Sequence, residues 1–245
     1  MSKFSLPTET VELPSKGLLA APDSPLSSGK IEMKYMTTRE EDILTNPSYI
    51  ANGTVIDRLL EALIVTDIDY NELSIGDKNA IMVAARILSY GKDYPITYKG
   101  KEYVVDLSLV NNKPLDDSLY SGPSTEFSFT LPTAKIEVKF KLLNHGEETK
   151  MLDEIEGLRK IQGENAPEST TRLRYMIVEV DGSRDRKDIK DFIDNYFLAR
   201  DARAFREYYA QVQPDIDLTA KIDVNGVEEE VEIPIGITFF WPDAE

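Results

Sequence analysis

Residues 218–233, LTAKIDVNGVEEEVEI, carry the clearest fold signal in the chain. The pair Asn225-Gly226 stands between two runs in which apolar and polar residues alternate, Leu218 to Val224 and Val227 to Ile233. An Asn-Gly pair flanked by alternating hydrophobic residues is the strongest short-range signal for a hairpin. The sequence therefore predicts two antiparallel strands close to its end.

The same alternation predicts further strands upstream. Pro95 to Tyr98 and Glu102 to Ser108 flank Lys99-Gly100-Lys101, which predicts a second hairpin. Three more runs have the spacing of strands: Phe127, Phe129 and Leu131; Ile136, Val138, Phe140 and Leu142; Leu173, Tyr175, Ile177, Val178 and Val180.

Segments with helical spacing separate these strands. Thr37 and Thr38 each precede a glutamate by three residues, and these capping boxes predict a short helix through Ile43 and Leu44. A later helix should begin near Asp77 and stop at Gly91. Other apolar stripes predict helices over residues 54–64, 147–162, 189–197 and 201–212.

These elements predict an α+β fold, with an N-terminal extended arm, a small helical unit, and antiparallel sheets with packed helices. The loop from Asn111 to Pro123 is rich in turn-forming residues and is the expected domain boundary. The predicted divisions are a Pro-rich arm (1–36), a helical unit plus hairpin (37–112), and an α+β domain ending in a hairpin and an aromatic tail (113–245).

The first 36 residues are interrupted by prolines, which favour extended backbone. Val11 and Leu13 point one way, as do Ile31, Met33 and Tyr35. One interpretation is a strand pair packed on its own domain. The other is an arm laid on a neighbouring subunit by strand addition.

Composition narrows the function classes. The 245 residues carry a net charge of −16, which repels phosphate backbones, so we expect no nucleic-acid partner. Without cysteine, the chain has no disulfides, thiol nucleophiles or Cys-based zinc sites. No apolar stretch is long enough to span a membrane, and the first residues lack the pattern of a secretion signal. We therefore expect a soluble, intracellular protein.

A search for catalytic chemistry identifies no catalytic, cofactor-binding or metal-binding residues. Asp67 and Asp69 could share a divalent ion, which leaves a carboxylate metal-dependent hydrolase as a remote alternative, but a solvated loop is the simpler interpretation. The stretch Asp181 to Asp185 starts like a calcium loop but lacks the glycine that an EF-hand needs; we expect Ser183 or Asp185 to cap a helix. The single histidine, His145, has no evident nucleophile partner and fits the first turn of a helix.

Two surfaces have competing interpretations. The hairpin acids Asp223, Glu228, Glu229, Glu230 and Glu232 form either a solvated face or a docking surface for a basic partner. The last aromatic residues, Phe239-Phe240-Trp241, either close the core or anchor the chain in a partner. In an extended chain Phe239 and Trp241 would share the core side, which makes Phe240 the expected contact.

Several blocks of sequence carry a family resemblance. They are Glu12-Leu13-Pro14-Ser15-Lys16-Gly17, Ile31-Glu32-Met33-Lys34, Met36 to Leu44, Ile75 to Ile81, Ala84 to Gly91, Ile233-Pro234 and Phe239 to Pro242. In this order they resemble the baseplate hub and hub-assembly proteins of T-even-type contractile-tailed bacteriophages. The blocks from Met36 to Leu44 and from Asp77 to Gly91 are the most specific, and residues 110–215 add little.

The resemblance implies a non-enzymatic structural or assembly role during tail assembly, through contacts with other hub, spike or tape-measure proteins or with further copies of the chain. Location would be the host cytoplasm during assembly, and the tail baseplate if the protein is retained. Some relatives resemble a zinc ribbon at the last hairpin, but Val224-Asn225-Gly226-Val227 holds no ligand. The alternative role is a transient assembly factor that leaves before the particle is mature.

The candidate residues for protein contacts come from the arm, the first helix and the tail. They are Leu13, Pro14, Ile31, Met33, Tyr35, Arg39, Glu40 and Phe240. In the first helix, Arg39, Glu40 and Asp42 are expected to project outward, with Ile43 and Leu44 buried.

Overall fold

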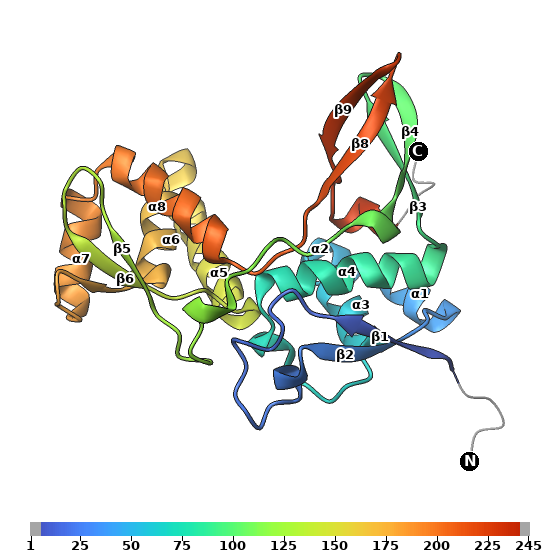
Figure 1. Ribbon diagram of the computed structural model, residues 1–245, viewed down its shortest axis with the longest axis horizontal. Coiled ribbons are helices and arrows are strands. Elements are labelled where there is room, and N and C mark those ends of the chain that lie inside the picture. The colour runs from blue at the N-terminus through green and yellow to red at the C-terminus, as the bar shows by residue number, and fades with distance from the viewer. Residues whose placement is uncertain (1–5, 241–245) are drawn as a thin grey trace.

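The structure is a computed structural model, which describes residues 6–240 (Figure 1). It confirms the α+β class, since its described residues form eight α-helices and four small antiparallel sheets. The helices are α1 (Thr38–Leu44), α2 (Pro47–Ala51), α3 (Val55–Leu63), α4 (Ile75–Tyr90), α5 (His145–Gln162), α6 (Glu168–Met176), α7 (Arg186–Asn195) and α8 (Ala199–Val212). The strands are β1 (Thr8–Glu12), β2 (Lys30–Lys34), β3 (Asp93–Tyr98), β4 (Lys101–Asp106), β5 (Phe127–Thr130), β6 (Glu137–Phe140), β7 (Ile177–Val180), β8 (Thr219–Val224) and β9 (Val227–Glu232).

The chain forms two lobes with separate hydrophobic cores (Figure 1). The first lobe comprises residues 6–110 and 216–240, because buried residues from Leu13 to Leu107 share one core with those from Ile216 to Phe240. The second lobe comprises residues 120–212 and has a core of its own. The chain thus leaves the first lobe near residue 111 and returns to it near residue 216.

The last hairpin belongs to the first lobe, although we expected it to complete a domain of residues 113–245. Ile222 and Val224 of β8 and Val231 of β9 lie in the same core as Tyr94 and Val105 of β3 and β4. The apolar residues of the hairpin pack against these residues. The two hairpins are far apart in the sequence, so local patterns do not predict this contact.

Both predicted hairpins are confirmed. β3 pairs with β4 and β8 with β9, each in antiparallel register across a two-residue turn. At Asn225-Gly226 the φ angles are 57° and 86°, so both central residues are left-handed, as a type I′ turn requires. The remaining sheets are β1–β2 and the three-stranded β5–β6–β7.

The predicted strand from Leu173 to Val180 is wrong in its first half. Residues 168–176 form α6, and only Ile177–Val180 form a strand, β7. Leu173 and Ile177 both lie in the second core. Residues four apart share a face in a helix as well as in a strand, so their alternation with Tyr175 does not distinguish the two. Helix α2 was also not predicted.

The residues expected to form an arm pack on their own lobe. β1 and β2 are antiparallel, and Val65 extends their sheet because its N–H donates to the Glu32 carbonyl over 2.8 Å. Leu13, Ile31 and Met33 are buried in the first core. Of our two interpretations, the structure therefore has the strand pair packed on its own domain.

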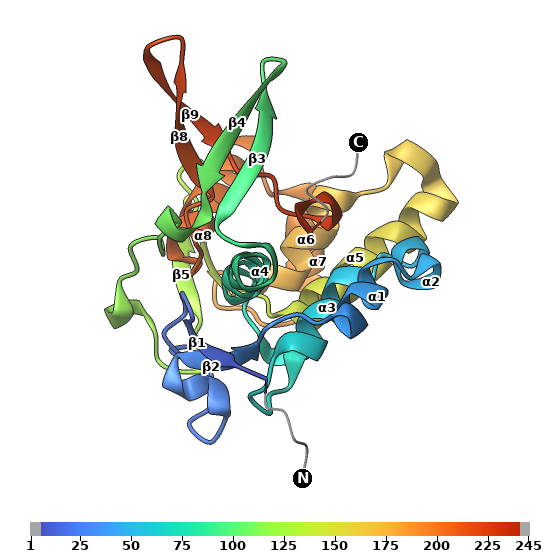
Figure 2. The same cartoon turned by 90° about the vertical axis from the view of Figure 1, so that its right-hand side faces the viewer.

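Helix α4 is the central element of the first lobe. Figure 2 looks along α4, with the two hairpins above it and β1–β2 below. Near its C-terminal end, buried Arg86 donates from Nε to the Phe239 carbonyl over 3.0 Å. The last described residues are thereby tied to the same helix. Among the described helices, none is both long and apolar enough to span a membrane.

Candidate functional site at the start of helix α4

Helix α4 begins where distant parts of the chain meet. Ser74 caps the helix, because its side chain accepts the N–H of Asp77 over 3.1 Å. In the turn that follows, Gly76, Asp77, Lys78 and Asn79 contact segments from both lobes. The first turn of α4 therefore determines how several segments are held together.

Asp77 fixes the loop that follows β1. Its Oδ1 accepts the N–H of Ser15 over 2.9 Å, and both residues are buried. Burial raises the pKa of Asp77, although hydrogen bonds from Ser15 and Ser74 act in the opposite direction. Two of the blocks that carry the family resemblance thus meet at one buried contact.

Gly76 lies against the backbone that returns from the second lobe. A Cβ atom at this position would lie 1.9 Å from the carbonyl oxygen of Pro214, so any side chain would force two backbones apart. Beside it, Asn79 Nδ2 donates to Asp215 Oδ1 over 3.0 Å. The close crossing of helix and chain therefore depends on glycine.

The outgoing and returning segments are paired where they pass α4. The N–H of Lys113 donates to the Asp215 carbonyl over 2.8 Å, and the N–H of Asp217 donates to the Asn111 carbonyl over the same distance. The Lys113 ammonium also lies 3.4 Å from the Asp215 carboxylate. The two-segment connection is thereby held on α4.

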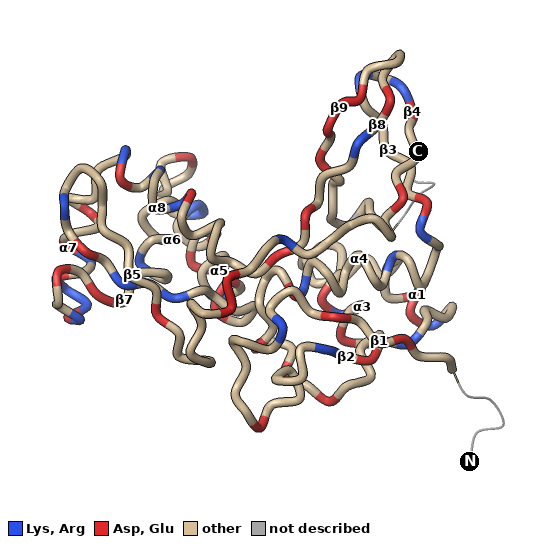
Figure 3. Tube along the Cα trace, in the orientation of Figure 1, with Lys and Arg blue, Asp and Glu red and all other residues tan. Residues whose placement is uncertain are grey.

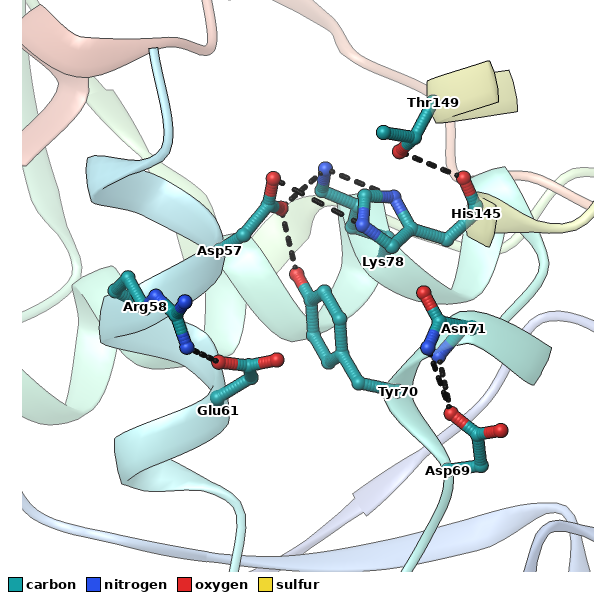
Figure 4. A network of polar contacts seen from close by, with 9 residues as sticks. All are labelled: Asp57, Arg58, Glu61, Asp69, Tyr70, Asn71, Lys78, His145 and Thr149. Carbon is teal, nitrogen blue, oxygen red and sulfur yellow. Dashed lines mark hydrogen bonds and ion pairs between the residues drawn. The ribbon is translucent and has the colours of Figure 1, made fainter. Parts of the chain in front are cut away.

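Lys78 points into a polar network between the lobes (Figure 4). Its Nζ lies 2.5 Å from Oδ1 of Asp57, on α3, and 3.3 Å from Nδ1 of His145, on α5. The hydroxyl of Tyr70 donates to the same Asp57 oxygen over 2.9 Å. The ring of Tyr70 also meets the His145 ring edge-on, with 4.8 Å between centroids. This network joins the first lobe to the start of α5.

His145 is the first residue of α5, which confirms the predicted position at a helix start. Because an ammonium only donates, Nδ1 accepts from Lys78, and the proton of the neutral ring lies on Nε2, 3.8 Å from Asp57. Burial and then the charge of Lys78 lower the pKa of His145, against the opposing influence of Asp57 and Glu61. The hydroxyl of Thr149 donates to the His145 carbonyl and not to its ring.

We call the first turn of α4 and its partners the lobe junction: Ser74 to Asn79 with Ser15, Asp57, Tyr70, His145, Pro214 and Asp215. Its chemistry is that of a buried structural bridge, in which charges are paired and backbones are in close contact. No local pattern in the sequence predicted that these residues lie together. The only signals were the glycine just before the predicted helix and the family resemblance of the surrounding block.

The structure separates the predicted contact residues into two groups. Buried within their own chain are Leu13, Pro14, Ile31, Met33, Glu40 and Phe240. Tyr35 is half-buried and Arg39 is exposed. Of the predicted contact residues, only Tyr35 and Arg39 therefore have side chains that are at least partly exposed.

Glu40 and Phe240 differ from expectation for identifiable reasons. The capping box draws Glu40 back to Thr37, and Lys34 lies 3.0 Å from its carboxylate. Burial would raise the pKa of Glu40, but the hydrogen bonds from Thr37 and Lys34 hold it at about 2.

Phe239 and Phe240 are both fully buried because the chain turns there as a 3-10 helix, η6 (Ile237–Phe240), instead of running extended. Trp241 lies outside the described residues.

Two of the carboxylates considered for a metal site, Asp69 and Asp185, have structural partners. Asp69 accepts the N–H of Asn71 over 2.9 Å and starts the 3-10 turn η2 (Tyr70–Glu72). Asp185 caps α7 by accepting the N–H of Lys187, which confirms the capping prediction. Between residues 6 and 240, no group of three or more His, Cys, Asp or Glu side chains is placed to hold a metal ion.

A cleft of about 400 Å³ lies beside the lobe junction. One wall comes from the first lobe, with Leu19, Ala20 and Glu72, and the other from the second, with Glu126 and Lys141. The acids of the second wall are paired, because Glu126 contacts Arg184 and Glu147 contacts Lys141. The cleft marks the boundary between the lobes.

A sequence model of the family described as T4 bacteriophage base plate protein matches residues 7–241, which is nearly the whole chain. No curated protein and no solved structure matches the chain significantly.

Proposed function

Because the chain belongs to the T4 bacteriophage base plate protein family, we propose that it is a non-enzymatic structural component of the baseplate hub. Membership implies a structural role in the tail baseplate and contacts with other baseplate proteins. The match over residues 7–241 is the observation that carries the proposal. The more specific assignment to the hub rests on the resemblance of the sequence blocks to hub and hub-assembly proteins.

The two-lobed architecture suits a structural protein that connects other proteins. Two lobes with separate cores are joined through partly buried, paired groups, so a partner on one lobe would be held at a set position relative to the other. Hub, spike and tape-measure proteins are the proposed partners. Assembly would begin in the host cytoplasm and end in the virion tail.

The alternative is a transient hub-assembly factor, which the same family resemblance supports. Quantitative mass spectrometry of washed, purified tails distinguishes the two roles. A hub component is present in a fixed ratio to known baseplate proteins, and an assembly factor is absent from tails but present in lysates. Absence from tails would overturn the proposed role as a resident component.

A further inference from the structure

The two hairpins of the first lobe pack against each other as two layers that project from the molecule (Figures 1 and 2). Their facing sides share the first core, through Ile96 and Val105 on one layer and Ile222 and Val231 on the other. Polar contacts join the layers nearer the tips: Tyr98 and Lys99 both contact Glu229, over 3.0 and 2.6 Å. The layers therefore have a fixed relative position.

Strand β9 lies at an open edge of this structure. It pairs with β8, and no other described strand pairs with it. The N–H of Ile233 donates to the Leu218 carbonyl over 2.7 Å, which sets the hydrogen-bonding phase of the hairpin. Along an antiparallel pair, residues alternate between bonding to the partner strand and pointing their backbone groups away from it. The N–H and C=O groups of Glu228, Glu230 and Glu232 therefore point away from β8.

A groove of about 340 Å³ runs beside this edge, between the layers. Its lining includes Ile96 and Tyr98 of β3 and Val231 and Ile233 at the end of β9. Pro95 lies in the middle of β3 and has no N–H, which makes the edge of β3 a poor partner for a strand. Of the two edges beside the groove, β9 is therefore the one able to pair.

Strand β9 is rich in acidic residues (Figure 3). Glu228, Glu230 and Glu232 are all exposed and alternate along one side. Across the hairpin, Lys221 contacts Glu228 over 2.7 Å, and Asp223 adds another negative charge. A strand that pairs with β9 would place every second side chain beside these glutamates and the others over the groove.

We propose that the edge of β9 binds an extended segment of a second protein in which Lys or Arg alternates with apolar residues. The backbone of that segment pairs with Glu228, Glu230 and Glu232, its basic residues lie beside their carboxylates, and its apolar residues cover the groove. The chemistry of this segment follows from the edge of β9 and the groove. Only the expectation that a baseplate protein supplies the segment rests on the proposed function.

Charged residues on an edge strand also serve to prevent pairing. The two roles predict opposite results with a synthetic peptide that alternates lysine and valine and is blocked at both ends. If the edge binds, the peptide associates with the full-length protein and slows amide hydrogen exchange at positions 228, 230 and 232 about tenfold. A glutamate–valine peptide binds about tenfold more weakly or not at all.

Two variants separate strand pairing from simple charge attraction. Glu230→Pro removes the outward N–H without removing a hydrogen bond to β8, so we expect an unchanged melting temperature and loss of peptide binding. Glu230→Gln keeps the N–H and should weaken binding only slightly. A lysine–valine peptide N-methylated at alternate amides blocks pairing from the other side and should not bind, with the protein itself unaltered.

Equal binding to wild type and Glu230→Pro, or binding without protection at positions 228, 230 and 232, would overturn the proposal and indicate attraction by charge alone. Absence of binding by the lysine–valine peptide would overturn it as well. The measurement needs no tail particle. Failure here therefore leaves the hub proposal intact, and absence of the protein from tails would leave a positive peptide result intact.

Discussion

The two lobes are stabilised in different ways. In the second lobe, aromatic rings form much of the core, with Phe205 fully buried among Phe140, Phe197 and Tyr209. The first core is mostly aliphatic, and around it lie buried polar residues such as Arg86 and Asp77, which bond to segments far away in sequence. The second lobe also has such a residue, the buried Asp201, which accepts the N–H groups of Thr133 and Ala134 over 2.7 and 3.0 Å. The two lobes thus differ mainly in the aromatic content of their cores.

The sequence blocks that first pointed to the family lie in one lobe, although the family model matches residues 7–241 and therefore covers both lobes. The resembling blocks come from both ends of the chain, up to residue 91 and from residue 233 onward. Their described residues belong to one lobe, and the middle of the sequence forms the other.

The largest expected effect comes from opening the second core. Phe205→Ala removes a fully buried ring and should lower the free energy of unfolding by about 4 kcal/mol. Because the cores are separate, hydrogen exchange should accelerate in α8 and β6 and change little in α4. Leu59→Ala in the first core is the control with the reverse pattern, and equal acceleration in both lobes would show that they unfold as one unit.

A smaller loss is expected at the lobe junction. Gly76→Ala places a Cβ atom against the Pro214 carbonyl and should lower the free energy of unfolding by about 3 kcal/mol, measured by chemical denaturation. The matched control is Gly157→Ala in α5, where nothing lies within 4 Å of the added atom. That substitution should stabilise the protein by about 0.5–1 kcal/mol. Similar results for the two variants would contradict the close crossing at Gly76.

His145 should make the junction sensitive to acid. Its pKa is lowered from 6.5 in the folded chain, so the unfolded chain binds more protons as the pH falls through 6.5, and folding stability decreases by at most about 1.4 kcal/mol per pH unit. His145→Gln removes this contribution. Burial raises the pKa values of Asp77 and Glu148, so these two residues make folding more favourable as the pH falls. Both are present in the wild type and in the variant. Parallel curves of melting temperature against pH for the two proteins would refute the assignment.

The smallest effect on stability is expected at Arg39. It is exposed on α1, and none of the described salt bridges involves it, so Arg39→Glu should change the free energy of unfolding by less than about 0.5 kcal/mol. If α1 contacts a baseplate partner, the same variant should be incorporated into tails less efficiently, as measured by mass spectrometry. Normal incorporation at normal stability would remove Arg39 from the contact surface.

Local signals predicted much of the fold. The turn at Asn225-Gly226 and the capping box from Thr37 to Glu40 are each determined by neighbouring residues, and both are confirmed. Alternation failed at Leu173, where a helix and a strand would bury the same positions. It failed again at Phe240, because a 3-10 turn lets adjacent rings face the same core.

The candidate site was not predictable from local patterns. Ser15 and Asp77 are 62 residues apart, Asn79 and Asp215 are 136 apart, and Arg86 reaches a residue 153 positions away. Such contacts leave no periodic signal in one sequence. The resembling blocks include Ser15 and the residues from Gly76 to Asn79 but not Asp57, His145 or Asp215, and only the structure shows that these residues meet.

Deletion of the gene from the phage that carries it tests the baseplate role most directly, with electron microscopy of the particles formed in infected cells. A baseplate structural protein predicts that tails lack complete baseplates, and that a plasmid copy of the wild-type gene restores them. A Gly76→Ala copy should restore them less well than a Gly157→Ala copy, because only the former disturbs the lobe junction. Normal baseplates and contractile tails in the absence of the protein would contradict the account.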